Sequence, residues 1–323
     1  MRATCHSTSL QRRYCSGVLS LSHVASIVLW VAAVALPLLL AWGSRDFVLQ
    51  VNSYREQPVV KSTDQVLCVL EGESDGGTPL TLVHTTFPDR VQQLFSNASL
   101  QTAFVKTSNT DVDADGIPES VQVEIATPLS TNEIIRHATV VVVLDYTLKS
   151  YAKLNIDVLT VFRHSSSLAG DTLYADGDLS FHQRYPLEIT DSIQQPYVDS
   201  PIVNMTSTNT TQELLLQSLI SGYRERNYTA NFYVPYPIWT PNANSSEDIR
   251  VFRVLMDIRI DPVNVLYTPE WPEIVKHAWI QYYCIFVVVS TLAFALREYL
   301  FISKLLPSVC VVDEPRMKPT KYE

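Results

Sequence analysis

The chain has 323 residues, of which 24 are Lys or Arg and 33 are Asp or Glu, so its formal net charge is −9. An acidic chain lacks the excess of cationic side chains that neutralises phosphate backbones, which argues against a nucleic-acid partner. Two long stretches without any charged residue divide the chain and determine how the remainder is interpreted.

The first uncharged stretch is residues 24–42, which we predict to be a transmembrane helix. It follows an N-terminal tail, 1–23, that contains Arg2, Arg12 and Arg13 and no acidic residue. At 1.5 Å per residue such a stretch spans roughly 28 Å, close to the roughly 30 Å of hydrocarbon in a bilayer. A cleaved signal peptide is the alternative, but its apolar core is normally shorter, at roughly 7–15 residues.

The second uncharged stretch is residues 278–296, which we also predict to span the membrane. Aromatic residues crowd its beginning, and Arg297 and Lys304 follow its end, as is typical of a span with anchors at both interfaces. A buried helix of a large globular domain is the alternative, but little sequence follows the stretch. Small residues such as Ala33 and Ser290 allow the two helices to pack on each other or on partner helices.

The distribution of charge predicts the orientation of these helices. Basic residues in short flanking segments resist translocation, and both tails, 1–23 and 297–323, contain more basic than acidic residues. We therefore expect both tails in the cytosol and the acidic segment between the helices, 43–277, in the lumen or outside the cell. Only Cys68 lies in that segment, so it cannot form an internal disulfide. The tail cysteines Cys5, Cys15 and Cys310 are candidates for acylation, although free thiols are the simpler interpretation.

Glycosylation sequons agree with this topology. All five N-x-S/T sequons of the chain fall in the 43–277 segment, where the lumenal machinery would reach them. The acceptor residues are Asn97, Asn204, Asn209, Asn227 and Asn244.

The 43–277 segment has the pattern of a mainly β domain, and we predict an antiparallel β-sandwich with one inserted helix. Apolar and polar residues alternate over 121–125 and 254–260, whereas Ala138–Leu144 is a continuous run that is typical of a strand buried on both faces. Further strands are expected at Phe47–Val51, Gln65–Leu70 and Leu80–His84, and turns at Glu73–Gly77 and Asp176–Asp178.

Two segments depart from the strand pattern. Thr211–Arg226 has Leu215, Leu219 and Tyr223 at helical spacing, which predicts a helix that covers an end of the sandwich. Tyr233–Pro241 is rich in aromatic residues and proline and is expected to be an ordered irregular loop packed on the core. A recognition loop for a partner is the alternative interpretation of this segment.

The strongest candidate site is DVDADGIPE, residues 111–119. It places acidic residues at positions 1, 3, 5 and 9 and glycine at position 6, a spacing that can wrap oxygen ligands around Ca²⁺. Position 12 is Gln122 rather than the glutamate of an EF-hand, so the segment is more similar to the short calcium loops that join β-strands in integrin propellers. A solvated acidic turn is the alternative. The candidate ligands are the carboxylates of Asp111, Asp113, Asp115 and Glu119 and the carbonyl of Ile117.

Catalytic signatures are absent from the sequence. It contains no HExxH, GxSxG or phosphate-binding glycine loop, and its histidines lack the spacing of a zinc site. Asp176 and Asp178 could form an acid–base pair, but a tight turn at Gly177 is the simpler interpretation. We therefore expect no enzymatic activity, and no cofactor other than structural Ca²⁺.

The order of several short motifs resembles that of the transmembrane protein 231 family over nearly the whole chain. None of these motifs is catalytic, and their number, order and spacing carry the resemblance. They are SYREQPVV (53–60), ESDG (73–76), the DxDxDG loop (111–116), LYADGDL (173–179), YRERN (223–227), PIW (237–239) and VKHAWIQY (275–282). The N-terminal tail is longer than the family pattern suggests, and the tail from Pro307 diverges from it.

The resemblance implies a component of the tectonic-like, or Meckel, complex at the transition zone of the cilium. Members of this family help to form the diffusion barrier between ciliary and plasma membranes, and they support cilium assembly and hedgehog signalling. The resemblance also implies tectonics, meckelin and other transition-zone membrane proteins as partners, besides the bilayer itself. The family has no known catalytic residue to transfer to this chain.

Two other functions remain as alternatives. An auxiliary subunit of a transporter, as in the two-span glycosylated partners of lipid flippases, has a similar layout but usually depends on disulfides that Cys68 alone cannot supply. A sugar-processing enzyme anchored at both ends would require a carboxylate pair in a deep cleft.

Overall fold

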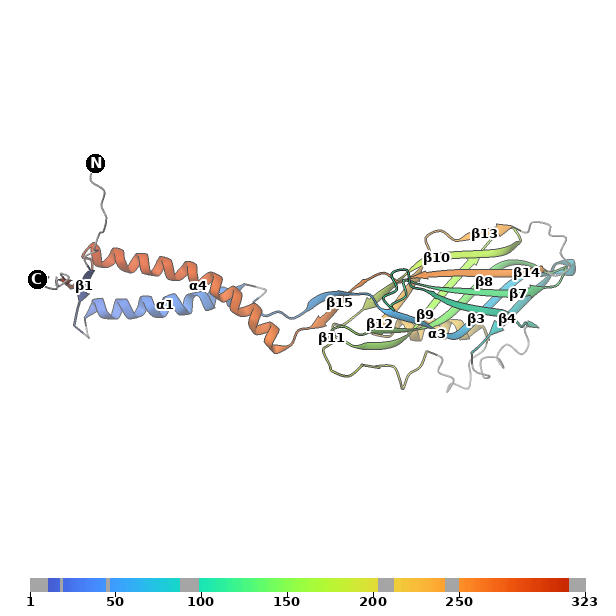
Figure 1. The fold of residues 1–323 in the computed structure, drawn as a ribbon, viewed down its shortest axis with the longest axis horizontal. Helices are drawn as coiled ribbons and strands as arrows, with labels where there is room; N and C mark the ends of the chain where they lie inside the picture. Colours follow the sequence, from blue (N-terminus) through green and yellow to red (C-terminus); the bar gives the residue numbers. More distant parts are fainter. Residues whose placement is uncertain are drawn as a thin grey trace, which may run out of the picture. The chain divides into compact units, whose positions relative to one another are not determined.

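The structure consists of two units. The computed structural model describes residues 11–17, 20–44, 47–87, 99–202, 212–241 and 250–313. One unit, Met1–Gln50 with Glu270–Glu323, contains two long helices, and the other, Val51–Pro269, is a β domain. Figure 1 shows the helices and strands of both units. The predicted fold class, a mainly antiparallel β domain flanked by two candidate transmembrane helices, is confirmed.

The two long helices are α1 (Leu21–Gly43) and α4 (Trp271–Ile302). Both are long and apolar enough to cross a membrane, and most of their side chains are not buried in protein. The apolar stretches 24–42 and 278–296 lie within α1 and α4. Both helices continue past these stretches, because helical hydrogen bonding belongs to the backbone and does not end where apolar side chains end.

Helices α1 and α4 pack on each other. Trp30 and Phe294 meet edge-to-face with ring centroids 5.4 Å apart. Ala33 and Ala41 on α1 and Ser290 on α4 are buried, and such small side chains let helix backbones approach closely. Of the two arrangements that the sequence left open, the structure therefore shows the helices in contact with each other.

A short sheet that the sequence did not predict joins the two tails. Strands β1 (Gln11–Cys15) and β16 (Val309–Asp313) pair in antiparallel fashion. The hydroxyl of Ser22 donates a 2.5 Å hydrogen bond to the carbonyl of Pro307, and the rings of Tyr14 and Phe301 lie 5.6 Å apart. The two tails are thus held together beside the helix pair.

The β domain is a sandwich of two sheets, which we name after one strand of each. The β8 sheet has the order β5-β4-β3-β8-β9, and the β14 sheet has the order β12-β10-β14-β7-β6 with β13 also pairing with β10. The β8 sheet comprises β3 (Val59–Ser74), β4 (Thr78–Thr85), β5 (Ser99–Leu100), β8 (Ile134–Leu148) and β9 (Leu154–Ser165). The β14 sheet comprises β6 (Phe104–Thr110), β7 (Ser120–Leu129), β10 (Gly170–Gln183), β12 (Tyr228–Tyr233), β13 (Ile238–Pro241) and β14 (Arg250–Arg259).

A smaller sheet brings the two ends of the β domain together. Its strands are β2 (Asn52–Glu56), β11 (Leu187–Glu188) and β15 (Val263–Thr268). The first strand of the domain, β2, pairs in antiparallel fashion with the last strand, β15. Most pairings in the domain are antiparallel, but β10 pairs with β14 in parallel, and so do β4 with β5 and β11 with β15.

The main core lies between the two large sheets and is built by alternation along each strand. Val140 and Val142 of β8 face this core, whereas Val141 and Val143 belong to a second cluster on the outer face of the β8 sheet. The second cluster also contains Leu219 of helix α3 (Gln212–Arg224). The prediction that the 138–144 run is buried on both faces is therefore confirmed.

The predicted position of the helix is wrong. Helix α3 packs on the outer face of the β8 sheet rather than at an end of the sandwich. The reason is that the β8 sheet has apolar side chains on both faces. Those on the outer face are removed from water only when another element, here α3, packs on them.

The predicted turn at Asp176–Asp178 is also wrong, because these residues lie inside β10. A Cβ atom added to Gly177 would lie only 2.3 Å from the carbonyl oxygen of Tyr233, so the glycine permits a close backbone approach. Strands β12 and β13 pair successively with the same strand, β10, and the residues between them include Pro235 and Pro237, which cannot donate to the ladder.

Three other local predictions need adjustment. Phe47–Val51 forms bends and extended chain instead of a strand. The predicted loop Tyr233–Pro241 is irregular only at 234–237, because its ends belong to β12 and β13. The predicted turn Glu73–Gly77 is present but shorter, as the 3₁₀ segment η1 (Asp75–Gly77), and Gly76 and Gly77 both have positive φ.

Candidate functional site

The acidic segment 111–119 forms a loop between β6 and β7, at one end of the β14 sheet. The amide of Glu119 donates to the carbonyl of Thr110 at 2.9 Å, which closes the loop at its base. The carbonyl of Glu119 accepts from the amide of Ile260 at 2.8 Å, and Pro118 is buried. The base of the loop is therefore fixed to the sheet, while residues 111–116 are exposed.

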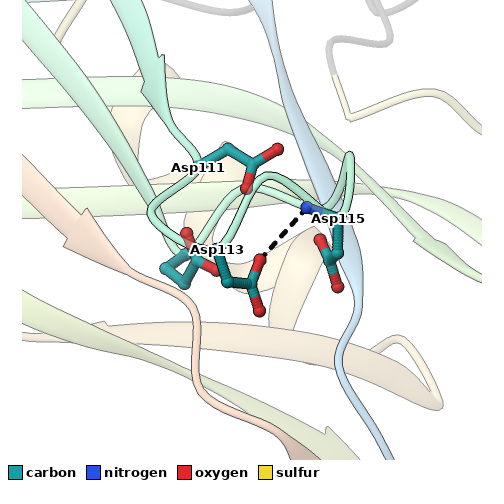
Figure 2. Close-up of side chains that lie close together, drawn as sticks. Asp111, Asp113 and Asp115 are labelled. Atoms are coloured by element: carbon teal, nitrogen blue, oxygen red, sulfur yellow. Dashed lines mark hydrogen bonds between the residues drawn. The ribbon is translucent and has the colours of Figure 1, made fainter.

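Aspartate side chains hold the loop in its turn. The Asp113 carboxylate accepts from the Asp115 amide at 3.2 Å, as Figure 2 shows, and the Asp111 carboxylate accepts from the Gly116 amide at 2.9 Å. Ala114 and Gly116 both have positive φ, at 59° and 87°. Glycine adopts this conformation without strain, which explains why position 6 of the loop is a glycine.

The four acidic side chains converge on one point. One carboxylate oxygen from each of Asp111, Asp113, Asp115 and Glu119 lies within 4.8 Å of the others. The remaining hydrogen bonds of the loop run from the Ile117 amide to Asp115 and from the Val112 amide to Glu119, both at 2.7 Å. Each carboxylate therefore keeps one oxygen without a hydrogen bond among the described residues. Four oxygens in this arrangement suit a hard cation such as Ca²⁺. The Ile117 carbonyl as a fifth ligand stays a prediction.

Among the predicted glycosylation sites, the structure describes only Asn227. This residue follows α3 and is exposed, so its side chain is accessible to a glycan. Its backbone N–H donates to the hydroxyl of Tyr197 at 2.9 Å, which leaves the side-chain amide out of this bond. The other predicted acceptors, Asn97, Asn204, Asn209 and Asn244, lie outside the described residues, so their occupancy stays a prediction.

The SYREQPVV motif supports the turn between β8 and β9. The Glu56 carboxylate accepts from the amides of Lys149 and Ser150 at 2.7 and 2.8 Å. The Tyr54 hydroxyl accepts from the amide of Ala152 at 3.1 Å, and burial raises the pKa of Tyr54 to about 12. These two side chains therefore connect the first strand of the domain to a turn that lies 93 to 98 residues later in the chain.

The YRERN and PIW motifs also have structural roles. The Tyr223 hydroxyl donates to the carbonyl of Ala230 at 2.9 Å and accepts from its amide at 2.6 Å. The Arg226 guanidinium lies over the ring of Tyr197, 4.5 Å from its centre. The indole of Trp239 donates to the carbonyl of Leu168 at 3.1 Å. The motif residues thus connect loops to the sandwich.

The candidate acid–base residues do not form a cleft. Asp176 and Asp178 point outward from β10, and Asp176 forms a salt bridge with Arg259. In the part of the chain that the structure describes, the acidic loop is the one group of His, Cys, Asp or Glu side chains placed to share a metal ion.

Sequence reasoning missed one charged group on the sheet. Asp176 and Asp257 are direct neighbours because β10 and β14 pair in parallel. Their alternation with buried residues shows that both point outward, but nothing in the sequence indicates that these two distant strands are adjacent.

The comparisons with known proteins give a consistent result. The family model described as Transmembrane protein 231 matches residues 1–310. Transmembrane protein 231 of Homo sapiens is 29% identical over 314 residues, which cover 95% of this chain and 94% of that protein. The Gallus gallus protein of the same name is 29% identical over 282 residues, which cover 87% of this chain and 84% of that protein.

A solved structure of a proton-activated chloride channel is similar over 87% of this chain and 99% of the channel chain, with 6% identity and a TM-score of 0.28. A likeness this low carries no argument about fold or function.

Proposed function

Because the chain belongs to the transmembrane protein 231 family, we propose that it is a membrane component of the tectonic-like complex at the ciliary transition zone. In this role it contributes to the diffusion barrier between ciliary and plasma membranes and to cilium assembly. It acts by binding rather than by catalysis. The single observation that carries the proposal is the family match over residues 1–310.

The architecture suits a binding role in a membrane. Two candidate transmembrane helices in mutual contact provide a compact anchor, and the β domain between them in sequence provides a folded surface. We propose tectonics, meckelin and other transition-zone membrane proteins as its partners. We further propose that both tails lie in the cytosol and that the β domain is glycosylated and lies on the opposite side.

The pairing of β1 with β16 supports the proposed topology, because strands that pair must lie on the same side of the membrane. Two spans would also place both tails on the same side of the membrane. Protease treatment of intact cells tests it: the proposal expects the β domain to be cleaved and tags on both tails to be protected. Cleavage of either tag in sealed cells would contradict it.

Imaging and affinity purification test the ciliary role. The full chain with a tag after Glu323 is expected to concentrate at the base of the cilium and to recover tectonics and meckelin from detergent extracts. A uniform signal over the plasma membrane or the endoplasmic reticulum would contradict the proposal. Recovery of a polytopic pump in place of these partners would favour the transporter-subunit alternative.

We also propose that the acidic loop binds Ca²⁺ as a structural ion. The convergence of four carboxylates within 4.8 Å supports this, since their mutual repulsion in the absence of a cation disfavours the loop geometry. The ion would connect the ends of β6 and β7 and take no part in chemistry.

A further inference from the structure

The outer face of the β14 sheet differs from that of the β8 sheet in having no cover among the described residues. On β6, β7, β10 and β14, every outward-facing side chain is at least partly exposed. The apolar contacts of α3 are with the β8 sheet. Within the described ranges, one face of the sandwich is therefore open.

An apolar row runs over three strands of this open face and ends at the charged pair Glu124 and Lys106. Tyr174 on β10 is paired with Leu255 on β14 and with Ile238 on β13, so the three side chains are neighbours on the same side. Ile238 is 55% exposed, and Tyr233, at the end of the adjacent β12, is 67% exposed. Tyrosine is enriched at the centres of protein interfaces, so the two tyrosines of this face are the side chains that point to a partner.

A hollow lies beside the apolar row. Its volume is about 190 Å³, several times the roughly 30 Å³ that one water molecule occupies in the liquid. It is large enough to receive a long side chain. The outward-facing side chains that line it include Lys106, Gln122, Glu124, Tyr174, Leu255 and Asp257.

Asp257 lines the hollow and Asp176 is its neighbour on β10, and both carboxylates are incompletely paired. Asp176 and Asp257 are direct neighbours in the ladder, and like charges at such positions repel. Arg259 pairs with one oxygen of Asp176, and the Gln122 amide donates a long bond, 3.5 Å, to one oxygen of Asp257. The second oxygen of each carboxylate is shielded from solvent and has no hydrogen-bond partner among the described residues. A carboxylate whose second oxygen lacks a donor is poorly compensated, and a nearby cation would offset its charge.

Acidic side chains outnumber basic ones by three to two around the hollow, because Glu124, Asp176 and Asp257 face Lys106 and Arg259. Burial and the nearby charges of Asp176 and Asp257 raise the pKa of Tyr174. The face is also free of glycan acceptors: no sequon lies in β6, β7, β10 or β14.

We propose that the outer face of the β14 sheet is a docking surface for a basic segment of a partner protein. A Lys or Arg side chain of this segment enters the hollow and pairs with Asp257, and its apolar neighbours pack on Tyr174, Leu255 and Ile238. A second copy of this chain fits poorly, because two copies of this face would bring the same carboxylates together. The inference rests on one part of the proposed function, namely that the protein acts by binding other proteins.

Site-specific photo-crosslinking of the full chain in cells tests this surface. The photoreactive residue p-benzoylphenylalanine replaces Leu255, and the control places it at Tyr185, which is 62% exposed and lies outside the four strands of this face. The expected result is an adduct from position 255, absent from position 185, in which the cross-linked peptide of the partner contains Lys or Arg. No adduct above the control, an adduct between two copies of the chain, or a partner peptide without a basic residue would overturn the proposal.

Charge-neutral variants test the role of the carboxylates. Asp257→Asn keeps the size of the side chain and is expected to lower the yield of the adduct about tenfold or more, since the partner cation loses its shielded counter-ion. Asp178→Asn, an exposed carboxylate on the same face, is the control and is expected to lower the yield about twofold or less. Equal effects of the two variants would overturn the proposal. A normal melting midpoint of Asp257→Asn shows that the chain is folded.

The same cells separate this inference from the proposed function. An adduct with the expected basic peptide in a protein that does not reach the ciliary base would contradict the ciliary role alone. Localisation at the ciliary base without any adduct at position 255 would contradict the docking surface alone.

Discussion

The two sheets of the β domain share one core but differ on their outer faces. In β8, Val142 faces the shared core and its neighbour Val141 lies under α3, so both faces are buried. In β14, Met256 faces the core and its neighbours Leu255 and Asp257 face outward. Both faces of the β8 sheet are therefore buried and contribute to the stability of the fold. Among the described residues, the outer face of the β14 sheet is exposed and is accessible to water or to a partner.

A polar substitution on each outer face gives the sharpest test of this difference. Val141→Asn places an amide without partners between the β8 sheet and α3, and is expected to lower the free energy of unfolding by about 3–5 kcal/mol. Leu255→Asn, at the matching outward position of β14, is expected to cost about 1 kcal/mol or less. Thermal unfolding of the full chain in detergent, followed by the circular dichroism of the strands, measures both. Similar losses of stability in both variants would contradict the comparison.

Truncation in α3 tests whether this helix stabilises the sheet beneath it. Leu219→Ala removes buried methyl groups and is expected to cost about 2–4 kcal/mol. Gln217→Ala changes an exposed position of the same helix and is the matched control, with an expected change within about 0.5 kcal/mol. If the two variants melt together, α3 does not serve as a cover.

Calcium bound in the 111–119 loop is expected to stabilise the β14 sheet, because this loop joins β6 to β7. At a free concentration 100 times its Kd, Ca²⁺ adds about 2.7 kcal/mol to the free energy of unfolding, and Asp113→Ala removes most of this gain. The measurement is the melting midpoint of the full chain with Ca²⁺ and with chelator. Identical midpoints for the unmodified chain in the two conditions would remove the calcium proposal.

The smallest expected effect concerns a single hydroxyl at the edge of α3. Burial raises the pKa of Tyr223 to about 12, from an ordinary value of about 10. The neutral phenol therefore favours the folded state below pH 10, and this contribution is lost as the pH rises from 10 to 12. Tyr223→Phe is expected to cost about 1–2 kcal/mol at neutral pH, because the bonds to Ala230 are lost, and to reduce the alkaline fall in stability by up to about 1.4 kcal/mol per pH unit. An unchanged alkaline slope would contradict the role of this hydroxyl.

Patterns within single segments were sufficient to predict much of the fold. The uncharged stretches predicted the two long helices, alternation predicted β7 and β14, and the 138–144 run predicted a strand buried on both faces. The spacing of the acidic residues in the 111–119 loop marked them as candidate ligands for one ion, and their oxygens lie within 4.8 Å of one another, while calcium binding itself stays a prediction. In each of these cases the sequence pattern that carries the prediction lies within a few neighbouring residues.

Features that depend on distant pairing were not predictable in this way. The sequence DGD at 176–178 has the composition of a turn, but pairing of these residues with β14, and of Asp178 also with β12, keeps the segment extended. The neighbouring of Asp176 and Asp257 and the placement of α3 on a sheet face have the same origin. The β1–β16 sheet joins residues 302 positions apart in the pair Gln11 and Asp313.

The pairing of β2 with β15 has a consequence for biosynthesis. Strand β2 is made early, yet its partner, Val263–Thr268, emerges from the ribosome only after the rest of the domain. Until then the β2 edge stays open to improper pairing with other chains. A premature stop codon between these strands would therefore remove the closing strand as well as α4, and we expect the truncated chain to be retained and degraded by quality control.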